Sequence, residues 1–243
     1  MVDFSFEEKL WNNGIKLIAG VDEVGRGALF GCVVAAACIL DPEDRIRGLR
    51  DSKLLKAEQR EKLATRIRQR AIGWAIAEVS AARIDEINIY QASLLAMKMA
   101  VEQLQPRPDY LLIDAARIDF DCPQKSIIHG DALSASIAAA SILAKVHRDA
   151  ILRSLDPLYP QYGLAHNKGY GTPFHKRALK EHGPSSLHRQ SWAPVAGARL
   201  EQLTLELCGQ ELAEVDEELA AEVIEEAIEE AMEEAEAEAE AEC

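Results

Sequence analysis

The chain has 243 residues, and 48% of them are hydrophobic, so it can bury the core of one large domain with a smaller appended region. Its formal net charge of −14 would argue against nucleic acid as a ligand if the charge were spread evenly along the chain. The charge is not spread evenly, because 16 of the 41 acidic residues lie from residue 211 onward, where there is no basic residue. The other 25 acidic residues are outnumbered by the 27 Lys and Arg, so the body of the protein permits an anionic polymer as ligand.

The cysteine pattern and the N-terminus indicate the compartment. The five cysteines form no CxxC pair and no regular spacing, which favours free thiols in a reducing compartment; they are Cys32, Cys38, Cys122, Cys208 and Cys243. Residues 1–11 lack the apolar core of a signal peptide, and the longest apolar run, residues 28–40, is too short to span a bilayer. We expect a soluble cytoplasmic protein that does not associate with membranes.

The first third of the chain predicts a strand pair, a helix and another strand. Residues 16–24 and 29–40 are predicted strands, joined as a hairpin by the glycine-containing turn at residues 25–27. The composition of residues 53–70, rich in Lys, Arg, Glu, Gln, Leu and Ala, predicts a helix. Residues 73–79 are a predicted third strand.

The middle of the chain predicts two long helices around two short strands. Apolar residues recur at helical spacing over residues 83–105, where two prolines end the pattern. Residues 110–114 are an apolar strand that ends in a carboxylate, and residues 126–129 are a second short strand. Residues 132–155 predict a helix whose small residues let it lie close to a sheet. The order of elements predicts a mixed α/β layer fold.

Four carboxylates stand at the ends of predicted strands or just before a helix: Asp22, Glu23, Asp114 and Asp131. Neighbouring side chains of a strand point to opposite faces, so one of the first two must face whatever packs on the sheet and needs a cation or hydrogen-bond donors. Convergent carboxylates without Cys or His suit Mg²⁺ or Mn²⁺. Asp114 as a turn residue and Asp131 as a helix N-cap remain alternatives for those two residues.

The motifs of the chain, taken in order, resemble those of ribonuclease HII. The matching segments are residues 22–27, 51–53, the strand that ends at Asp114, residues 135–146, 167–172 and 188–192. The resemblance covers about residues 17–195. An isolated Asp-Glu pair would be weak support, whereas this ordered set is specific.

The resemblance implies a type 2 ribonuclease H with an RNase H-like mixed β-sheet flanked by helices and a small helical C-terminal region. We expect an N-terminal extension (residues 1–15), a catalytic domain (16–156) and a C-terminal region that contacts the substrate (157–209). Outside the resemblance, the composition of residues 210–243 predicts an acidic, partly helical or disordered tail.

Enzymes of this family are expected to hydrolyse the RNA strand of RNA–DNA hybrids and to cut 5′ of single ribonucleotides in duplex DNA, in ribonucleotide excision repair and primer removal. Two divalent cations, Mn²⁺ or Mg²⁺, catalyse the cut and leave 3′-hydroxyl and 5′-phosphate ends. The resemblance makes Asp22, Glu23, Asp114 and Asp131 the catalytic metal ligands, with Asp22 nearest to both ions.

The resemblance also implies how the substrate is read. Gly25, Arg26 and Gly27 form the turn that approaches the 2′-hydroxyl of the ribonucleotide, where a Cβ would hold the nucleic acid away. Tyr170 stacks at the junction between RNA and DNA. Asn167 stands where a His commonly precedes the Lys of the motif, and it cannot titrate near neutral pH, so we assign it no role in proton transfer.

Basic residues in the matched region are candidates for phosphate contacts, and for each of them except Lys53 the favoured interpretation is a solvated surface residue; they are Lys53, Lys145, Arg148, Lys168 and Arg189. Lys53 and Lys168 lie inside matched motifs and are the predicted substrate-binding pair. Lys145, on the predicted 132–155 helix, could serve packing or DNA binding.

Two rival functions remain open at this point. A ribonuclease HIII-like enzyme would be specific for long hybrids, but such enzymes usually carry an extra N-terminal domain. A catalytically silent nucleic-acid-binding module on the same fold would not need all four acids. We expect a monomer whose acidic tail is a solubilising extension, with docking to an unknown basic partner as the alternative.

Overall fold

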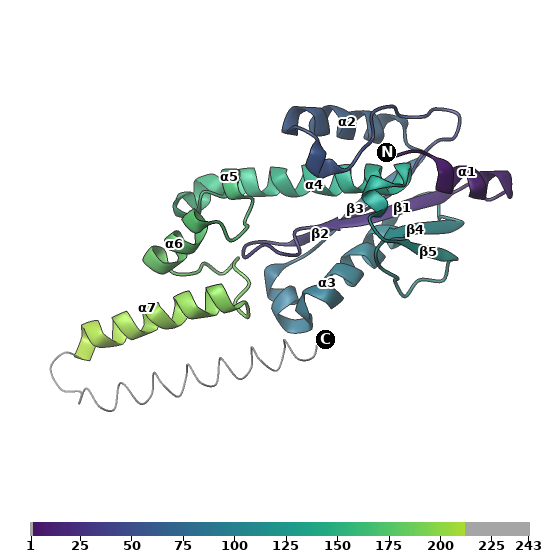
Figure 1. Cartoon of the computed structure of the whole chain (residues 1–243). Helices are drawn as coiled ribbons and strands as arrows, with labels where there is room; N and C mark the ends of the chain where they lie inside the picture. The colour runs from purple at the N-terminus through teal and green to yellow at the C-terminus, as the bar shows by residue number, and fades with distance from the viewer. Residues whose placement is uncertain (1, 212–243) are drawn as a thin grey trace.

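A computed structural model of the protein describes residues 2–211, and its centre is a five-stranded sheet in the order β3-β2-β1-β4-β5 (Figure 1). β1 pairs with β2, and β2 with β3, in antiparallel fashion, whereas β4 is parallel to both β1 and β5. The strands are β1 (Ile18–Val24), β2 (Val33–Ile39), β3 (Gly73–Val79), β4 (Tyr110–Asp114) and β5 (Gln124–Ile127). The predicted mixed sheet is confirmed.

Helices cover both faces of this sheet: α4 and α2 lie on one side and α3 on the other (Figure 1). The α-helices are α1 (Ser5–Asn12), α2 (Ala57–Arg70), α3 (Ala81–Gln103), α4 (Ala135–Leu155), α5 (Leu164–Asn167), α6 (Pro173–His182) and α7 (Ala193–Glu211). Short 3₁₀ turns are η1 (Ser52–Leu54), η2 (Gly130–Ala132), η3 (Asp156–Leu158) and η4 (Pro160–Tyr162). In the described part of the chain, no helix has the length and apolar character needed to cross a membrane.

The burial of β2 on both faces explains its continuous apolar sequence. Every residue of β2 is buried. Val33 and its alternate neighbours pack in the core under α3, whereas Val34 and its alternate neighbours pack in the core under α4 and α2. A strand between two helical layers needs no polar face. The same alternation in β1 decides which carboxylates turn toward α4.

Helix α4 lies against β1 with almost no space between them. A Cβ built on Gly20 would lie 2.0 Å from the backbone carbonyl carbon of Ser136, so only glycine fits there. The Ala- and Ser-rich first half of α4 is fully buried, as predicted from its small residues. The Ser134 side chain caps this helix by accepting a hydrogen bond from the N–H of Ile137.

The N-terminal segment, residues 2–15, packs against the sheet through α1. Glu7 is fully buried, and its Oε1 accepts hydrogen bonds from the Ser134 hydroxyl (2.6 Å) and the Ser136 N–H (2.8 Å). Apolar residues of α1, including Phe6 and Leu10, join an apolar cluster between β4, β5 and α4. Helix α1 therefore fixes the N-terminal end of α4.

Several predicted boundaries differ from the structure by a few residues, and three of the differences have a clear physical reason. The β1–β2 connection is the eight-residue loop 25–32 rather than a tight turn, because residues within it pair with the C-terminal region. The predicted 53–70 helix begins only at Ala57, since Asp51 accepts a hydrogen bond from the N–H of Lys53 and closes the separate turn η1. Strand β5 ends at Ile127, before the left-handed residue His129.

The C-terminal region packs on the β1–β2 loop through its own apolar cluster. Leu29 and Phe30 from the loop meet Tyr162, Leu179 of α6 and Val195 of α7. The cysteines whose side chains are described, Cys32, Cys38 and Cys122, are free thiols, as predicted. The predicted tail, residues 210–243, lies outside the described residues from 212 onward.

The close approach of α4 to β1 generates a stability prediction. Gly20→Ala would force the helix away from the sheet, which we expect to cost about 1–3 kcal/mol, as overpacking of a tight core does. The control is Gly27→Ala, since a Cβ there meets no atom within 4 Å. Urea denaturation of both variants measures the difference. Equal stabilities would contradict the packing at Gly20.

Candidate active site

The sheet brings the carboxylates of β1 and β4 to one end. Asp22 follows Val21, which pairs with Ile113, so Asp22 and Asp114 lie side by side at the ends of parallel neighbours. Both belong to the alternation that faces α4, because Gly20 on β1 contacts α4 and Leu112 on β4 packs with its first turn. Asp22 is only 5% exposed. The prediction that one residue of the Asp-Glu pair faces a packing element is therefore confirmed.

Burial and neighbouring negative charge destabilise the ionised form of Asp22. Burial raises its pKa well above the usual value, and the charges of Glu23 and Asp114 raise it further. Hydrogen bonds from Ser141 on α4 and from the backbone N–H of Glu23, at 2.8 Å, offset the shift only in part. Asp22 thus lacks the positive partner that a buried carboxylate requires.

The other strand-end acids are shifted in the same direction. Burial raises the pKa of Glu23; Arg26, 3.4 Å away, lowers it and Asp114 raises it. Burial also raises the pKa of Asp114, although the N–H of Gly130 donates to its Oδ1 at 2.6 Å. The Glu23 Oε2 atom is buried without a hydrogen-bond partner.

Asp131 joins this group from the turn η2, where it is buried. The Lys53 ammonium lies 3.3 Å from Asp131 Oδ2, while the Lys53 side chain is 80% exposed. Partial burial lowers the pKa of Lys53, but Asp131, Asp51 and Asp22 outweigh it and raise the pKa overall. Because the N–H of Gly130 donates to Asp114, β4 and η2 hold two of the four predicted acids, Asp114 and Asp131, near Lys53.

The four acids fit a divalent cation by charge and donor type. In the part of the chain that the structure describes, no three His, Cys, Asp or Glu side chains are drawn together closely enough to hold an ion. Carboxylates that repel one another stay apart until a cation offsets their charge. The unpartnered oxygen of Glu23 and the raised pKa values of its neighbours are the features that a hard cation would relieve.

Two buried arginines hold the loop that follows β1. The Arg189 guanidinium donates to the carbonyl oxygens of Gly25, Arg26 and Gly31, and it is fully buried. Burial lowers the pKa of Arg189 to about 9, and the nearby Arg148 contributes to that shift. No carboxylate within the described residues forms an ion pair with either arginine.

Arg148 holds the other end of this loop and links it to the C-terminal region. Its guanidinium donates to the carbonyls of Cys32 (3.0 Å), Phe30 (3.1 Å) and Lys168 (2.9 Å). A Cβ on Gly25, where φ is +97°, would lie 2.3 Å from Arg148 Nε, so this position requires glycine. The prediction that Arg148 and Arg189 contact phosphates is wrong, because burial removes both from solvent.

The segment after α5 brings Tyr170 beside the turn. Tyr170 forms an isolated bridge with Ala28, and its ring lies 5.6 Å from the Arg148 guanidinium. Asn167 holds the segment: its amide donates to the Tyr162 carbonyl at 2.6 Å and accepts from the N–H of Gly169 at 2.8 Å. Asn167 therefore has a structural role.

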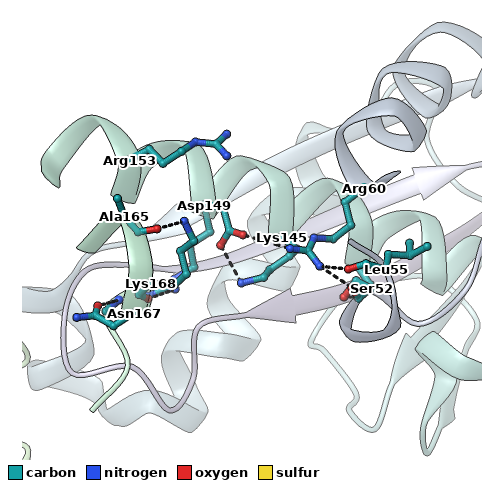
Figure 2. A network of polar contacts seen from close by, with 12 residues as sticks. Ser52, Leu55, Arg60, Lys145, Asp149, Arg153, Ala165, Asn167 and Lys168 are labelled. Carbon is teal, nitrogen blue, oxygen red and sulfur yellow. Dashed lines mark hydrogen bonds and ion pairs between the residues drawn. The ribbon is translucent and has the colours of Figure 1, made fainter. Parts of the chain in front are cut away.

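Of the predicted substrate-binding residues, Gly25, Arg26 and Gly27 adjoin the acids on β1, and Lys53 contacts Asp131. Lys168 belongs to the polar network around Asp149 (Figure 2).

The sequence did not single out Ser141, and it predicted a phosphate contact for Arg148 although that residue is buried. Ser141 hydrogen-bonds Asp22 and lies 3.0 Å from the Ser52 hydroxyl, which ties η1 to α4. The sequence does contain an indication that Arg148 is buried. It lies four residues after Ala144 and four before Leu152, so it shares a helix face with two apolar residues that are themselves buried.

The electrostatics of Asp22 generate a prediction for the metal-free protein. A carboxyl whose folded pKa is raised stabilises the fold below its ordinary pKa and loses this contribution as pH rises through the folded pKa. In EDTA at pH 7, Asp22→Asn should therefore raise the melting temperature, with the difference shrinking toward pH 4. Calorimetry of both proteins at each pH measures this difference in melting temperature. A variant less stable than the wild type at pH 7 would contradict the account.

Comparison with known proteins identifies the family. The family description Ribonuclease HII matches residues 19–195. The chain is 63% identical over 209 residues to a ribonuclease HII of Koribacter versatilis, covering 86% of this chain and 82% of the relative. A ribonuclease HII of Solibacter usitatus is 56% identical over 191 residues, which cover 79% and 84% of the two chains.

Solved structures agree with this fold. The ribonuclease H2 from Pyrococcus horikoshii OT3 has a TM-score of 0.68 at 26% identity, and RNase HII in the PCNA complex from Archaeoglobus fulgidus has 0.64 at 27%. Each comparison covers 75% of this chain and 97% of the other. The chain therefore belongs to the ribonuclease HII family and is a type 2 ribonuclease H, a hydrolase that acts on RNA–DNA hybrids.

Proposed function

We propose that the enzyme cuts both the RNA strand of RNA–DNA hybrids and the 5′ side of single ribonucleotides in duplex DNA, leaving 3′-hydroxyl and 5′-phosphate ends. The observation that carries this proposal is the group of buried or half-buried acids at the ends of β1 and β4, next to a turn with a fixed backbone and an open outer side. Ribonucleotide excision repair and primer removal are the corresponding roles.

Asp22, Glu23, Asp114 and Asp131 are the proposed ligands of two divalent cations, Mn²⁺ or Mg²⁺. When bound, such cations activate water and stabilise the charge on the leaving oxygen of a phosphodiester. The acids supply only negative charge, and Asp22 is held between β1 and α4 by its hydrogen bonds to Ser141 and to the N–H of Glu23. Lys53, largely exposed and paired with Asp131, is placed to bind a phosphate of the substrate.

The turn at Gly25, Arg26 and Gly27 is the proposed reader of the ribose. Its carbonyls at positions 25 and 26 are engaged by Arg189, so the backbone is held from behind. A Cβ on Gly27 would point into open space, so the fold does not require glycine there. A strand of nucleic acid in close approach does require it, and the 2′-hydroxyl marks that strand as RNA.

Tyr170 is the proposed junction residue because the bridge to Ala28 sets it beside this turn. Its ring rests on the Arg148 guanidinium, which fixes one face. Lys168, two residues earlier, is the further proposed substrate contact.

We also propose that the protein is a cytoplasmic monomer and that any partner of its acidic tail is basic.

Loss of the central carboxylate tests the catalytic assignment. Asp22→Asn should lower cleavage of a hybrid and of a duplex with one ribonucleotide by at least about 100-fold, the usual effect of removing one group that stabilises transition-state charge. Binding of both substrates should stay close to wild type. A gel assay with Mg²⁺ or Mn²⁺ and a binding titration measure the two quantities. Near-normal cleavage by the variant would refute the assignment.

Alterations at the turn and at the tyrosine test the specificity assignment. Gly27→Ala should leave the melting temperature unchanged but lower kcat/KM on a single-ribonucleotide duplex by about 100-fold, since a displacement of about 1 Å at the reacting group costs that much. Tyr170→Ala should reduce cleavage of the same duplex. Matched kinetics on a long hybrid show whether the effect is specific. Wild-type rates on the single-ribonucleotide duplex would contradict both roles.

A further inference from the structure

A cluster of basic residues gathers around one buried carboxylate of α4, Asp149 (Figure 2). Asp149 is buried, and Lys145, one turn earlier on α4, lies 2.8 Å from its Oδ1. Arg60 of α2 lies 3.8 Å from its Oδ2. The charge of Asp149 also acts on Lys168, which follows α5. Three elements thus direct cations toward a single acid.

The cations of this cluster outnumber the carboxylates that partner them. Arg153, one turn beyond Asp149 on α4, is 45% exposed and pairs with Glu61 at 2.9 Å. The basic cluster (Arg60, Lys145, Arg153 and Lys168) therefore has two carboxylate partners for four positive charges within the described residues, Asp149 and Glu61. Burial lowers the pKa of Lys168, and nearby cations lower it further. An anion at this surface would relieve the excess.

The cluster is built on well-held elements. Arg60 donates to the carbonyls of Ser52 (3.0 Å) and Leu55 (2.5 Å), while Lys168 donates to the Ala165 carbonyl at 2.5 Å. The other two members of the cluster, Lys145 and Arg153, lie on α4 itself. The two stand eight residues apart on one helix face, or about 12 Å along the axis. That length matches about three to four phosphates of one strand at about 3.4 Å each.

Both ends of the cluster lead to the proposed active site. Arg60 holds the carbonyl of Ser52, whose neighbour Lys53 contacts Asp131. Lys168 is followed by Gly169, whose carbonyl accepts from the N–H of Leu29 in the β1–β2 loop, at 2.8 Å. A polyanion lying on the cluster would therefore be continuous with one that reaches the acids.

We propose that Lys145 and Arg153 form a phosphate-binding face that holds the phosphodiester backbone of the bound duplex beyond the site of cleavage. Asp149 and Arg60 order this face by fixing the lysine and the adjoining loop. The inference deepens the proposed function, since its ligand is the same duplex.

The test is the salt dependence of binding of the full-length protein to a DNA duplex with one ribonucleotide, measured by fluorescence anisotropy in EDTA so that no cleavage interferes. For Lys145→Gln and for Arg153→Gln, the slope of log Kd against log salt should fall by about 0.9 each, the value for one lost phosphate contact. The matched control is Lys98→Gln on α3, which removes one charge paired with Asp119 on the other face of the sheet.

Slopes equal to wild type in both variants would overturn the inference, and so would an equal fall in Lys98→Gln, which would indicate a general effect of net charge. Melting temperatures verify that each variant is folded. The same protein is then assayed for cleavage with Mn²⁺. Wild-type binding without cleavage would refute the proposed function and leave the phosphate-binding face intact, whereas cleavage with unchanged slopes would refute only the face.

Discussion

The site depends on the close packing of α4 against β1. At Gly20 the helix backbone meets the strand backbone, which leaves no room for even a methyl group. This contact buries Asp22 and brings Ser141 to it. Further along, α4 directs Arg148 inward to the β1–β2 loop, and it carries Lys145, whose ammonium lies beside Asp149. A single helix thus relates the acids, the loop and the basic cluster, so a shift of α4 would disturb all three.

Charges of like sign are concentrated at two neighbouring places in the fold. Carboxylates cluster at the ends of β1 and β4 without an adequate positive partner, whereas Arg148 and Arg189 are buried behind the loop with backbone carbonyls as their partners. Neither arrangement favours stability by itself, since buried charge is costly. Divalent cations would complement the carboxylates, whereas the two arginines are already complemented by the carbonyls of the loop that they hold. The protein therefore carries a stability cost at the proposed active site, as is common at functional sites.

The sequence predicted the strands and the acids well because both follow local rules. The apolar strands that carry Asp22 and Asp114 follow from periodicity and polarity, and small residues in α4 predicted its close approach to the sheet. Long-range contacts could not be predicted in this way. Arg189 lies 164 residues from the carbonyl of Gly25 that it binds, so nothing local marks it as buried. The eight-residue β1–β2 loop, unlike a tight turn, depends on those same contacts.

The central claim is that the acids at the ends of β1 and β4 form one cation site that is centred on Asp22. Direct titration of the metal-free protein with Mn²⁺, followed by electron paramagnetic resonance of the free ion, tests it. The account predicts that the wild type binds Mn²⁺ more tightly as pH rises and these carboxyls ionise. It also predicts that Asp22→Asn loses most of this binding. Equal Mn²⁺ affinity in both proteins, or affinity independent of pH, would contradict it.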